Sequence, residues 1–537
     1  MDAAQQLAPR PARPARLARR RFLGALLLAG SGVTLLAACG GTAASTSSAS
    51  AAASTSASAA SSAATSAAAT ASSAATSSVA PSVSSVASIS APTSSSAASS
   101  SAAASISAAS SAATSSTAPS SAASAAGTPR TLTLWLQDVY YKSGTLGDTL
   151  IKEFAQQNPD VKVVSEPMPY SVTKLPQTVA AGQGPDLAHM DRYLAAEWGI
   201  KSIIQPLNSF LDQSKILTPS DWRDGLRDDV TWKAKIFAVP QGSDVWLFYW
   251  NKQSYQEVGL PTDQPPTSWD DLKTSAQKLY KADANGAIQR YGFAPQFGNG
   301  GAQAAWLIFM WQQGQDELSP DRTKAIFNTD LGLNALNLVV DLVKLQGGMA
   351  RFNDFVKGLS TNARSAALPA GKIVSHLDYQ GEPANIWKPA WPSLTTDNYG
   401  NGLIPKPPNG KDTTYQGGPT EVIPTPSKNP QDAIRFLEYL NTPANQVRWA
   451  DGIGAVPTSK SVLASDAYLS KDPARKIYAQ LGLGGKWVPV VPGAADILKL
   501  HSQLMTDALM ETKTPHDALT AAQTAIQVVL DKNLAGT

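Results

Sequence analysis

The stretch KIFAVPQGSDVWLFYWNK, residues 235–252, decides the fold that this sequence predicts. Residues 236–239 are typical of a strand, and residues 245–249 form a second apolar run. Pro240 and Gly242 lie between the two runs. Because proline cannot donate to a strand ladder and glycine relaxes the backbone, we expect the chain to leave one sheet here and to enter another.

An acid and three large aromatic residues follow this break: Asp244, Trp246, Tyr249 and Trp250. Such a group suits a polyol, because the carboxylate accepts hydroxyl hydrogen bonds and a ring covers the apolar face of a sugar. A buried strand explains the same aromatic residues. This stretch alone therefore leaves two interpretations open, a hydrophobic core and a sugar site.

Composition separates a leading region that cannot form a core from a region that can. All 13 Trp lie between Trp135 and Trp487, whereas residues 41–127 contain no charged and no aromatic residue. Residues 130–537 are long for one domain and natural for two. Residues 1–38 hold six Arg and one Asp, a charge of +5 in a chain whose total is +3, so the remainder carries −2. The region that can form a core therefore offers no basic excess for nucleic acid.

The leading region predicts export and anchoring. A basic segment, residues 10–21, precedes an apolar run that ends Leu-Ala-Ala before Cys39, which is the plan of a signal peptide. The RRRFL segment resembles a twin-arginine signal, and Leu-Ala-Ala-Cys resembles a bacterial lipobox with Cys39 as the lipidated residue. We expect residues 1–38 to be the signal peptide. Residues 39–129 would form a disordered Ala/Ser/Thr-rich tether at the extracytoplasmic face of a membrane.

Residues 131–164 predict a β-α-β unit. Residues 131–136 alternate like a strand, apolar residues from Leu146 to Phe154 recur at helical spacing, and residues 161–164 form the next strand. Such units build parallel sheets, whose ligands gather beyond the carboxyl ends of the strands. Trp135 and Asp138 stand at one such end, although Asp138 is equally explained as a turn residue.

Several short motifs then follow one another in a fixed order. They are AAGQGPDL at 180–187, the pair Asp191–Arg192, FAVPQGSD at 237–244, PPTSWDDL at 265–272, RYGFA at 290–294 and KNP at 428–430. In PPTSWDDL, Ser268 and Asp271 form a plausible capping pair. The order and spacing of these motifs resemble the family 1 extracellular solute-binding proteins, the maltose-binding-protein-like family, over nearly all of residues 130–537.

The resemblance implies an α/β protein of the two-lobed periplasmic-binding-protein type II class, with the ligand in a cleft between the lobes. The crossings would fall near residues 240–242 and 415–418. The first lobe would comprise residues 130–241 and 417–470, and the second residues 242–416 and 471–537. The paired glycines at 417–418 suit a hinge or a close approach to a ligand.

The resemblance also implies most of the ligand-binding residues. Together with Trp135 and Asp138, the predicted set is Asp191, Arg192, Asp244, Trp246, Gln296, Trp306, Asp378, Tyr379, Trp387, Gly417 and Gly418. Two departures argue against a maltodextrin in particular. Met190 stands beside the Asp–Arg pair in place of an aromatic residue, and no late aromatic is evident near Ile497.

We therefore expect a monomeric lipoprotein that binds a mono- or oligosaccharide and delivers it to the permease subunits of an ABC importer. We predict no catalytic residue and no cofactor. We also predict no metal site, because the four histidines show no metal-ligand spacing. Two alternatives are a lipid-anchored polysaccharide hydrolase or lyase that uses Asp244, and a sensory or adhesive cell-surface module.

Overall fold

The computed structural model describes residues 129–169, 171–298 and 300–535. The predicted signal peptide, Cys39 and nearly all of the predicted tether lie outside these residues. Within them, no helix has the length and the apolar character needed to cross a membrane.

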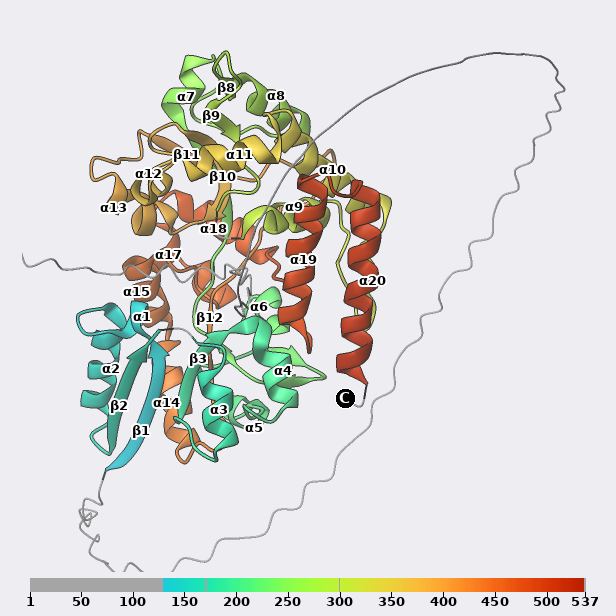
Figure 1. The fold of residues 1–537 in the computed structure, drawn as a ribbon. Coiled ribbons are helices and arrows are strands. Elements are labelled where there is room, and N and C mark those ends of the chain that lie inside the picture. Colours follow the sequence, from blue (N-terminus) through green and yellow to red (C-terminus); the bar gives the residue numbers. More distant parts are fainter. Residues whose placement is uncertain (1–128, 170, 299, 536–537) are drawn as a thin grey trace, which may run out of the picture. The chain divides into compact units, whose positions relative to one another are not determined.

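The first sheet contains five strands in the order β2-β1-β3-β12-β6 (Figure 1). They are β1 (Arg130–Gln137), β2 (Val161–Met168), β3 (Leu187–Asp191), β6 (Val239–Pro240) and β12 (Pro419–Val422). β1 runs parallel to β2 and β3, as the β-α-β pattern predicts, and β12 runs antiparallel to β3 and β6. The alternating leucines of β1, Leu132, Leu134 and Leu136, are buried on one face.

The second sheet also contains five strands, in the order β11-β7-β10-β9-β8. They are β7 (Trp246–Asn251), β8 (Lys281–Ala282), β9 (Ile288–Phe293), β10 (Ile373–Tyr379) and β11 (Tyr399–Gly402). All six residues of β7 are buried, which explains why its sequence is a continuous apolar run and not an alternating one.

The strand predicted at residues 236–239 is divided into two pieces. β5 (Lys235–Ile236) pairs with β4 (Thr231–Trp232) in a small hairpin, and only Val239 and Pro240 join the first sheet. Lys233 and Ala234 at the hairpin tip have φ angles of 46° and 63°. This left-handed pair makes the tight turn that joins the two short strands, and the sequence carries no glycine there to signal it.

Helices fill the connections. Those between strands of the first sheet are α1 (Asp138–Tyr141), α2 (Leu146–Gln157), α3 (Lys174–Ala180), η1 (Arg192–Leu194), α4 (Ala195–Ile200), α5 (Asn208–Leu211) and α6 (Asp224–Asp229). Those between strands of the second sheet are α7 (Lys252–Glu257), α8 (Trp269–Leu279), α9 (Gly301–Gln312), α10 (Asp330–Lys344), α11 (Gly348–Lys357), α12 (Thr361–Ser365), η2 (Pro383–Trp387) and α13 (Lys388–Ala390).

The remaining helices follow β12. They are α14 (Pro430–Leu440), α15 (Pro443–Ile453), α16 (Lys460–Leu463), α17 (Asp466–Leu469), α18 (Ala474–Leu483), α19 (Ala494–Leu509) and α20 (Pro515–Leu534). Figure 1 shows α19 and α20, in red, side by side.

The predicted capping pair is present at the start of α8. The Ser268 hydroxyl accepts a hydrogen bond from the Asp271 N–H at 3.0 Å, and the Asp271 carboxylate accepts one from the Ser268 N–H at 3.3 Å. This reciprocal arrangement satisfies two backbone donors that a helix start otherwise leaves unpaired.

The chain passes between the two sheets at two places. It leaves the first sheet after β6 and enters the second at β7, and it returns between β11 and β12. The residue bounds assigned above to the two lobes stay a prediction.

Candidate functional site

The two crossings are joined by backbone hydrogen bonds. The Asp244 N–H donates to the Gly417 carbonyl at 3.1 Å, and the Trp246 N–H donates to the Tyr415 carbonyl at 3.2 Å. The Asp244 side chain is therefore held where the outgoing and the returning segments meet.

Asp244 is half-buried, and its surroundings perturb its acidity. Burial raises the pKa of Asp244 most strongly, the positive charge of Arg192 and a side-chain hydrogen bond with Gln380 lower it, and the negative charge of Asp191 raises it. Gln380 is itself fixed, because it accepts from the Val245 N–H at 2.7 Å and donates to the Gly454 carbonyl at 2.8 Å. The result is an oriented carboxyl group with limited access to water.

The charge of Asp244 raises the pKa of two nearby tyrosines. Burial raises the pKa of Tyr140, and the charges of Asp244 and Asp191 raise it further. Burial likewise raises the pKa of Tyr379, and Asp244 contributes to that shift. Tyr140 comes from α1 beside the first sheet and Tyr379 ends β10 of the second, so both sheets supply a half-buried aromatic residue near one carboxyl group.

Trp487 completes this group from beyond α18. A Cβ atom on Gly417 would lie 2.4 Å from the Trp487 ring and 3.3 Å from Asp244 Oδ2, so the indole and the carboxylate meet across that glycine. The Trp487 ring also packs on Tyr415, with a centroid distance of 4.9 Å. Trp487 was not among the predicted ligand-binding residues: it is the last Trp in the chain but lies before the stretch near Ile497 where a late aromatic residue was expected.

Arg192 has a different environment from the one expected of a ligand contact. Its side chain is fully buried, and its Nε donates to Asp229 at 3.1 Å. Nη1 donates to the carbonyls of Gly242 and Gly418, and Nη2 to those of Gln416 and Gly417, at 2.8 to 3.3 Å. All five guanidinium donors are thus used. Through these hydrogen bonds, Arg192 links both crossings to the end of β3.

The glycines at 417 and 418 supply carbonyls to this arrangement. Gly418 has a φ of 122°, which a residue with a side chain rarely adopts. A Cβ atom there would lie 2.9 Å from the Gly242 carbonyl oxygen. The pair therefore allows the close approach of two backbone segments.

Four other predicted residues lie in the interior, namely Trp246, Trp306, Trp387 and Asp378, with 4%, 0%, 1% and 1% of their surface exposed. Trp306 donates its indole N–H to the Gly332 carbonyl, and Trp387 packs edge-on against Tyr249. These positions are those of core residues. We leave the four out of the solute contacts proposed below.

Three predicted residues are half-buried but lie in other surroundings. Trp135 is covered by the Lys174 ammonium group, 4.2 Å from the ring centroid, and Asp138 is the first residue of α1. Gln296 donates to the Tyr291 hydroxyl at 3.3 Å. Their part in binding stays a prediction.

A family model described as bacterial extracellular solute-binding protein matches residues 143–447. The chain belongs to this family. The prediction of a solute-binding protein from outside the cytoplasm is thereby confirmed at the level of the family.

Similar proteins of known name cover most of the chain. The sn-glycerol-3-phosphate-binding periplasmic protein of Shigella dysenteriae is 23% identical over 431 residues, or 73% of this chain and 90% of that protein. The structure of the sugar-binding protein MalE from Xanthomonas citri matches with a TM-score of 0.64 at 19% identity, covering 75% of this chain and 98% of that one. The cyclic alpha-maltosyl-1,6-maltose binding protein of Arthrobacter globiformis matches with a TM-score of 0.62 at 24% identity, covering 75% and 100%. These likenesses confirm the predicted two-lobed α/β fold of type II.

Proposed function

We propose that this solute-binding protein binds a neutral carbohydrate and delivers it to an ABC importer. The observation that carries the proposal is the oriented carboxyl group of Asp244, with Tyr140, Tyr379 and Trp487 around it. Carboxylate oxygens accept hydroxyl hydrogen bonds, and aromatic rings cover the apolar faces of sugar rings. The sugar-binding proteins named above have the same fold, which supports this choice of solute.

The charges near Asp244 favour a neutral solute over a phosphate ester. The carboxyl groups of Asp191 and Asp244 affect one another electrostatically, so a phosphate placed here would meet two acids. Arg192 and Arg223 are the cations that act on Asp244, and both are fully buried. Arg192 has also used all its donors. Although one relative is named for sn-glycerol-3-phosphate, we therefore expect this chain to bind a sugar without a phosphate group.

The mechanism requires no chemical step. A solute that contacts residues from both sheets binds the closed arrangement better than the open one, and so shifts the population toward the closed form. The importer would recognise that form. We further propose, from the sequence, that lipid on Cys39 and the tether keep the protein beside the membrane.

A binding experiment with matched controls tests the proposal. The full chain is titrated by calorimetry with mono-, di- and oligosaccharides and with glycerol phosphate, and each mixture is assayed for sugar products. We expect saturable binding of one sugar class without turnover. Loss of one charge-assisted hydrogen bond costs about 1.5–3 kcal/mol, so Asp244→Asn should weaken binding by roughly tenfold or more.

The controls separate the site from general effects. Trp487→Ala should also weaken binding, whereas Trp391→Ala removes an exposed indole and should not. Asp263→Asn, at an exposed acid, is the control for Asp244→Asn. Binding of glycerol phosphate but no sugar would overturn the choice of solute, and steady release of product would indicate an enzyme.

A further inference from the structure

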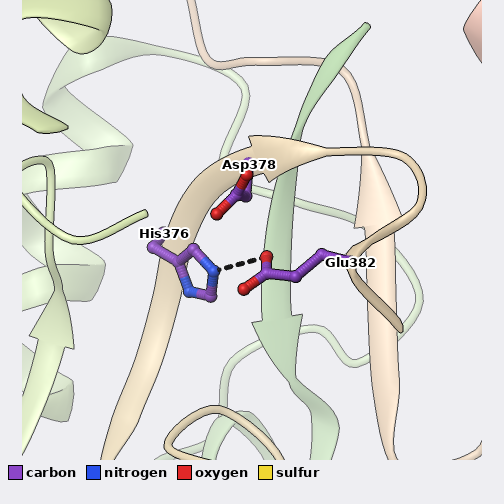
Figure 2. A group of neighbouring side chains, drawn as sticks. All are labelled: His376, Asp378 and Glu382. Atoms are coloured by element: carbon purple, nitrogen blue, oxygen red, sulfur yellow. Dashed lines mark hydrogen bonds and ion pairs between the residues drawn. The ribbon is translucent and has the colours of Figure 1, made fainter. Parts of the chain in front are cut away.

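Three side chains that can bind metal come together at the end of β10. His376 and Asp378 are two residues apart on this strand, so they point to the same face, and Glu382 returns to them from the turn before η2. Figure 2 shows the imidazole and both carboxylates directed toward one another. One donor atom from each lies within 4.8 Å of the other two. Nε2 of His376 is 2.9 Å from Oε2 of Glu382.

All three side chains are interior. His376 is 0% exposed, Asp378 1% and Glu382 5%. Two buried carboxylates repel each other unless a positive charge accompanies them; Asp378 and Glu382 share a side-chain hydrogen bond, so without an ion one of the two acids keeps a proton. A divalent cation would balance both charges at once.

The imidazole can act as a ligand through Nε2. His376 is fully buried with its ring directed into the cluster, and its Nδ1 has no hydrogen-bond partner among the described residues. A histidine that binds metal through Nε2 presents that lone pair to the ion and keeps its proton on Nδ1.

The donor set and spacing indicate the class of ion. One imidazole nitrogen with two carboxylate oxygens suits divalent first-row metals such as Zn²⁺ or Mn²⁺. Neighbouring ligands of an octahedral ion, at bonds of about 2.1 Å, lie on the order of 3 Å apart, which the His376–Glu382 distance already matches. Asp378 offers an oxygen within 4.8 Å of both other donor atoms.

Surrounding groups hold the three ligands in place. Asp378 Oδ1 accepts from the Tyr379 N–H at 2.7 Å, and the Glu382 carboxylate hydrogen-bonds with the side chain of Trp387. Phe297 packs edge-on to the His376 ring, with a centroid distance of 5.4 Å. Such support is what orients ligands in metal sites.

We propose that His376, Asp378 and Glu382 bind a divalent transition-metal cation through Nε2 and one oxygen of each carboxylate. The spacing of the four histidines in the sequence gave no sign of this site, because two of its three ligands are acids. The ion would fix the end of β10 immediately before Tyr379, a residue of the proposed solute site.

Zinc binding by the full chain tests the proposal. The protein is stripped with a chelator and dialysed against micromolar Zn²⁺, and bound zinc is measured by elemental analysis. We expect one equivalent. Co²⁺ in place of Zn²⁺ should give visible absorption bands that report nitrogen and oxygen ligands. Asp378→Asn and Glu382→Gln keep the side-chain shapes and should weaken zinc binding at least tenfold.

His516→Ala is the matched control, because the His516 side chain is 67% exposed and next to one acid, Asp517. It should bind zinc like the natural chain. Absence of stoichiometric zinc in the natural chain overturns the proposal, whether or not the variants fold. So does zinc that persists in both acid variants, or that is lost only when His189, His501 or His516 is changed. Sugar binding by the stripped protein is scored separately, because it tests the proposed function and not the metal site.

Discussion

Replacing Arg192 with lysine distinguishes two roles for this residue. It could contact the solute, or it could hold the two crossings and β3 together through hydrogen bonds. The guanidinium reaches one carboxylate and four carbonyls. A lysine keeps the charge but presents its three donors from one atom, so it cannot reach acceptors on Asp229 and on both crossings together. At least two buried carbonyls would lose their donor.

The magnitude follows from those lost bonds. A buried polar group left unpaired costs about 1–3 kcal/mol, so two of them cost roughly 2–6 kcal/mol. Whole domains are stable by only about 5–15 kcal/mol. We therefore expect Arg192→Lys to lower the urea midpoint of unfolding strongly, or to prevent folding.

Urea unfolding followed by tryptophan fluorescence measures this effect. Arg351→Lys, at an exposed position, is the control and should change stability by less than about 0.5 kcal/mol. The structural role is refuted, and the ligand role restored, if sugar affinity collapses while the free energy of unfolding of Arg192→Lys stays within about 1 kcal/mol of that of the natural chain, the contribution of roughly one hydrogen bond.

Three further predictions concern the site and one helix. Gly417→Ala places a Cβ atom 2.4 Å from the Trp487 ring and should displace it, which lowers sugar affinity in calorimetry; Gly358→Ala, whose nearest contact is 3.4 Å, should not. Sugar affinity should fall on acidification, because protonation of Asp244 removes its hydrogen-bond acceptor. Burial raises the pKa of Asp244, so the fall should start above the usual range for an aspartate and reach up to about tenfold per pH unit. If Asp244→Asn shows the same pH profile as the natural chain, this prediction is wrong. Ser268→Ala removes the cap of α8 and should cost about 1 kcal/mol in urea unfolding, without changing sugar affinity.

Much of the fold could be predicted because local signals agree with it. Alternation identified β1, helical spacing located α2, and the Pro–Gly break marked the passage into β7. The division of residues 236–239 could not be foreseen, because it depends on left-handed angles at Lys233 and Ala234. Neither residue type signals such a turn.

The site was less predictable because its residues are decided by distant contacts. Arg192 follows a strand, as a ligand contact would, but its acceptors at 416–418 lie about 225 positions away in the sequence. Trp306 and Trp487 are the same residue type, and only packing makes one a core residue and the other half-buried. Composition supplies the aromatic residues of such a site but does not say which of them reach it.

The strand order of the first sheet has a consequence for how the chain folds during synthesis. β12, at residues 419–422, lies between β3 and β6, although both of those strands are made long before it. The strands of the second sheet all lie between residues 246 and 402, so that sheet is complete earlier in the chain. Loop closure makes the late pairing of β12 slow. Until it is made, β3 is an open edge of the kind that pairs with other chains, and β6 has no partner strand in this sheet. The second sheet should therefore form first on the ribosome, and a chain cut short before residue 419 should aggregate through its first sheet.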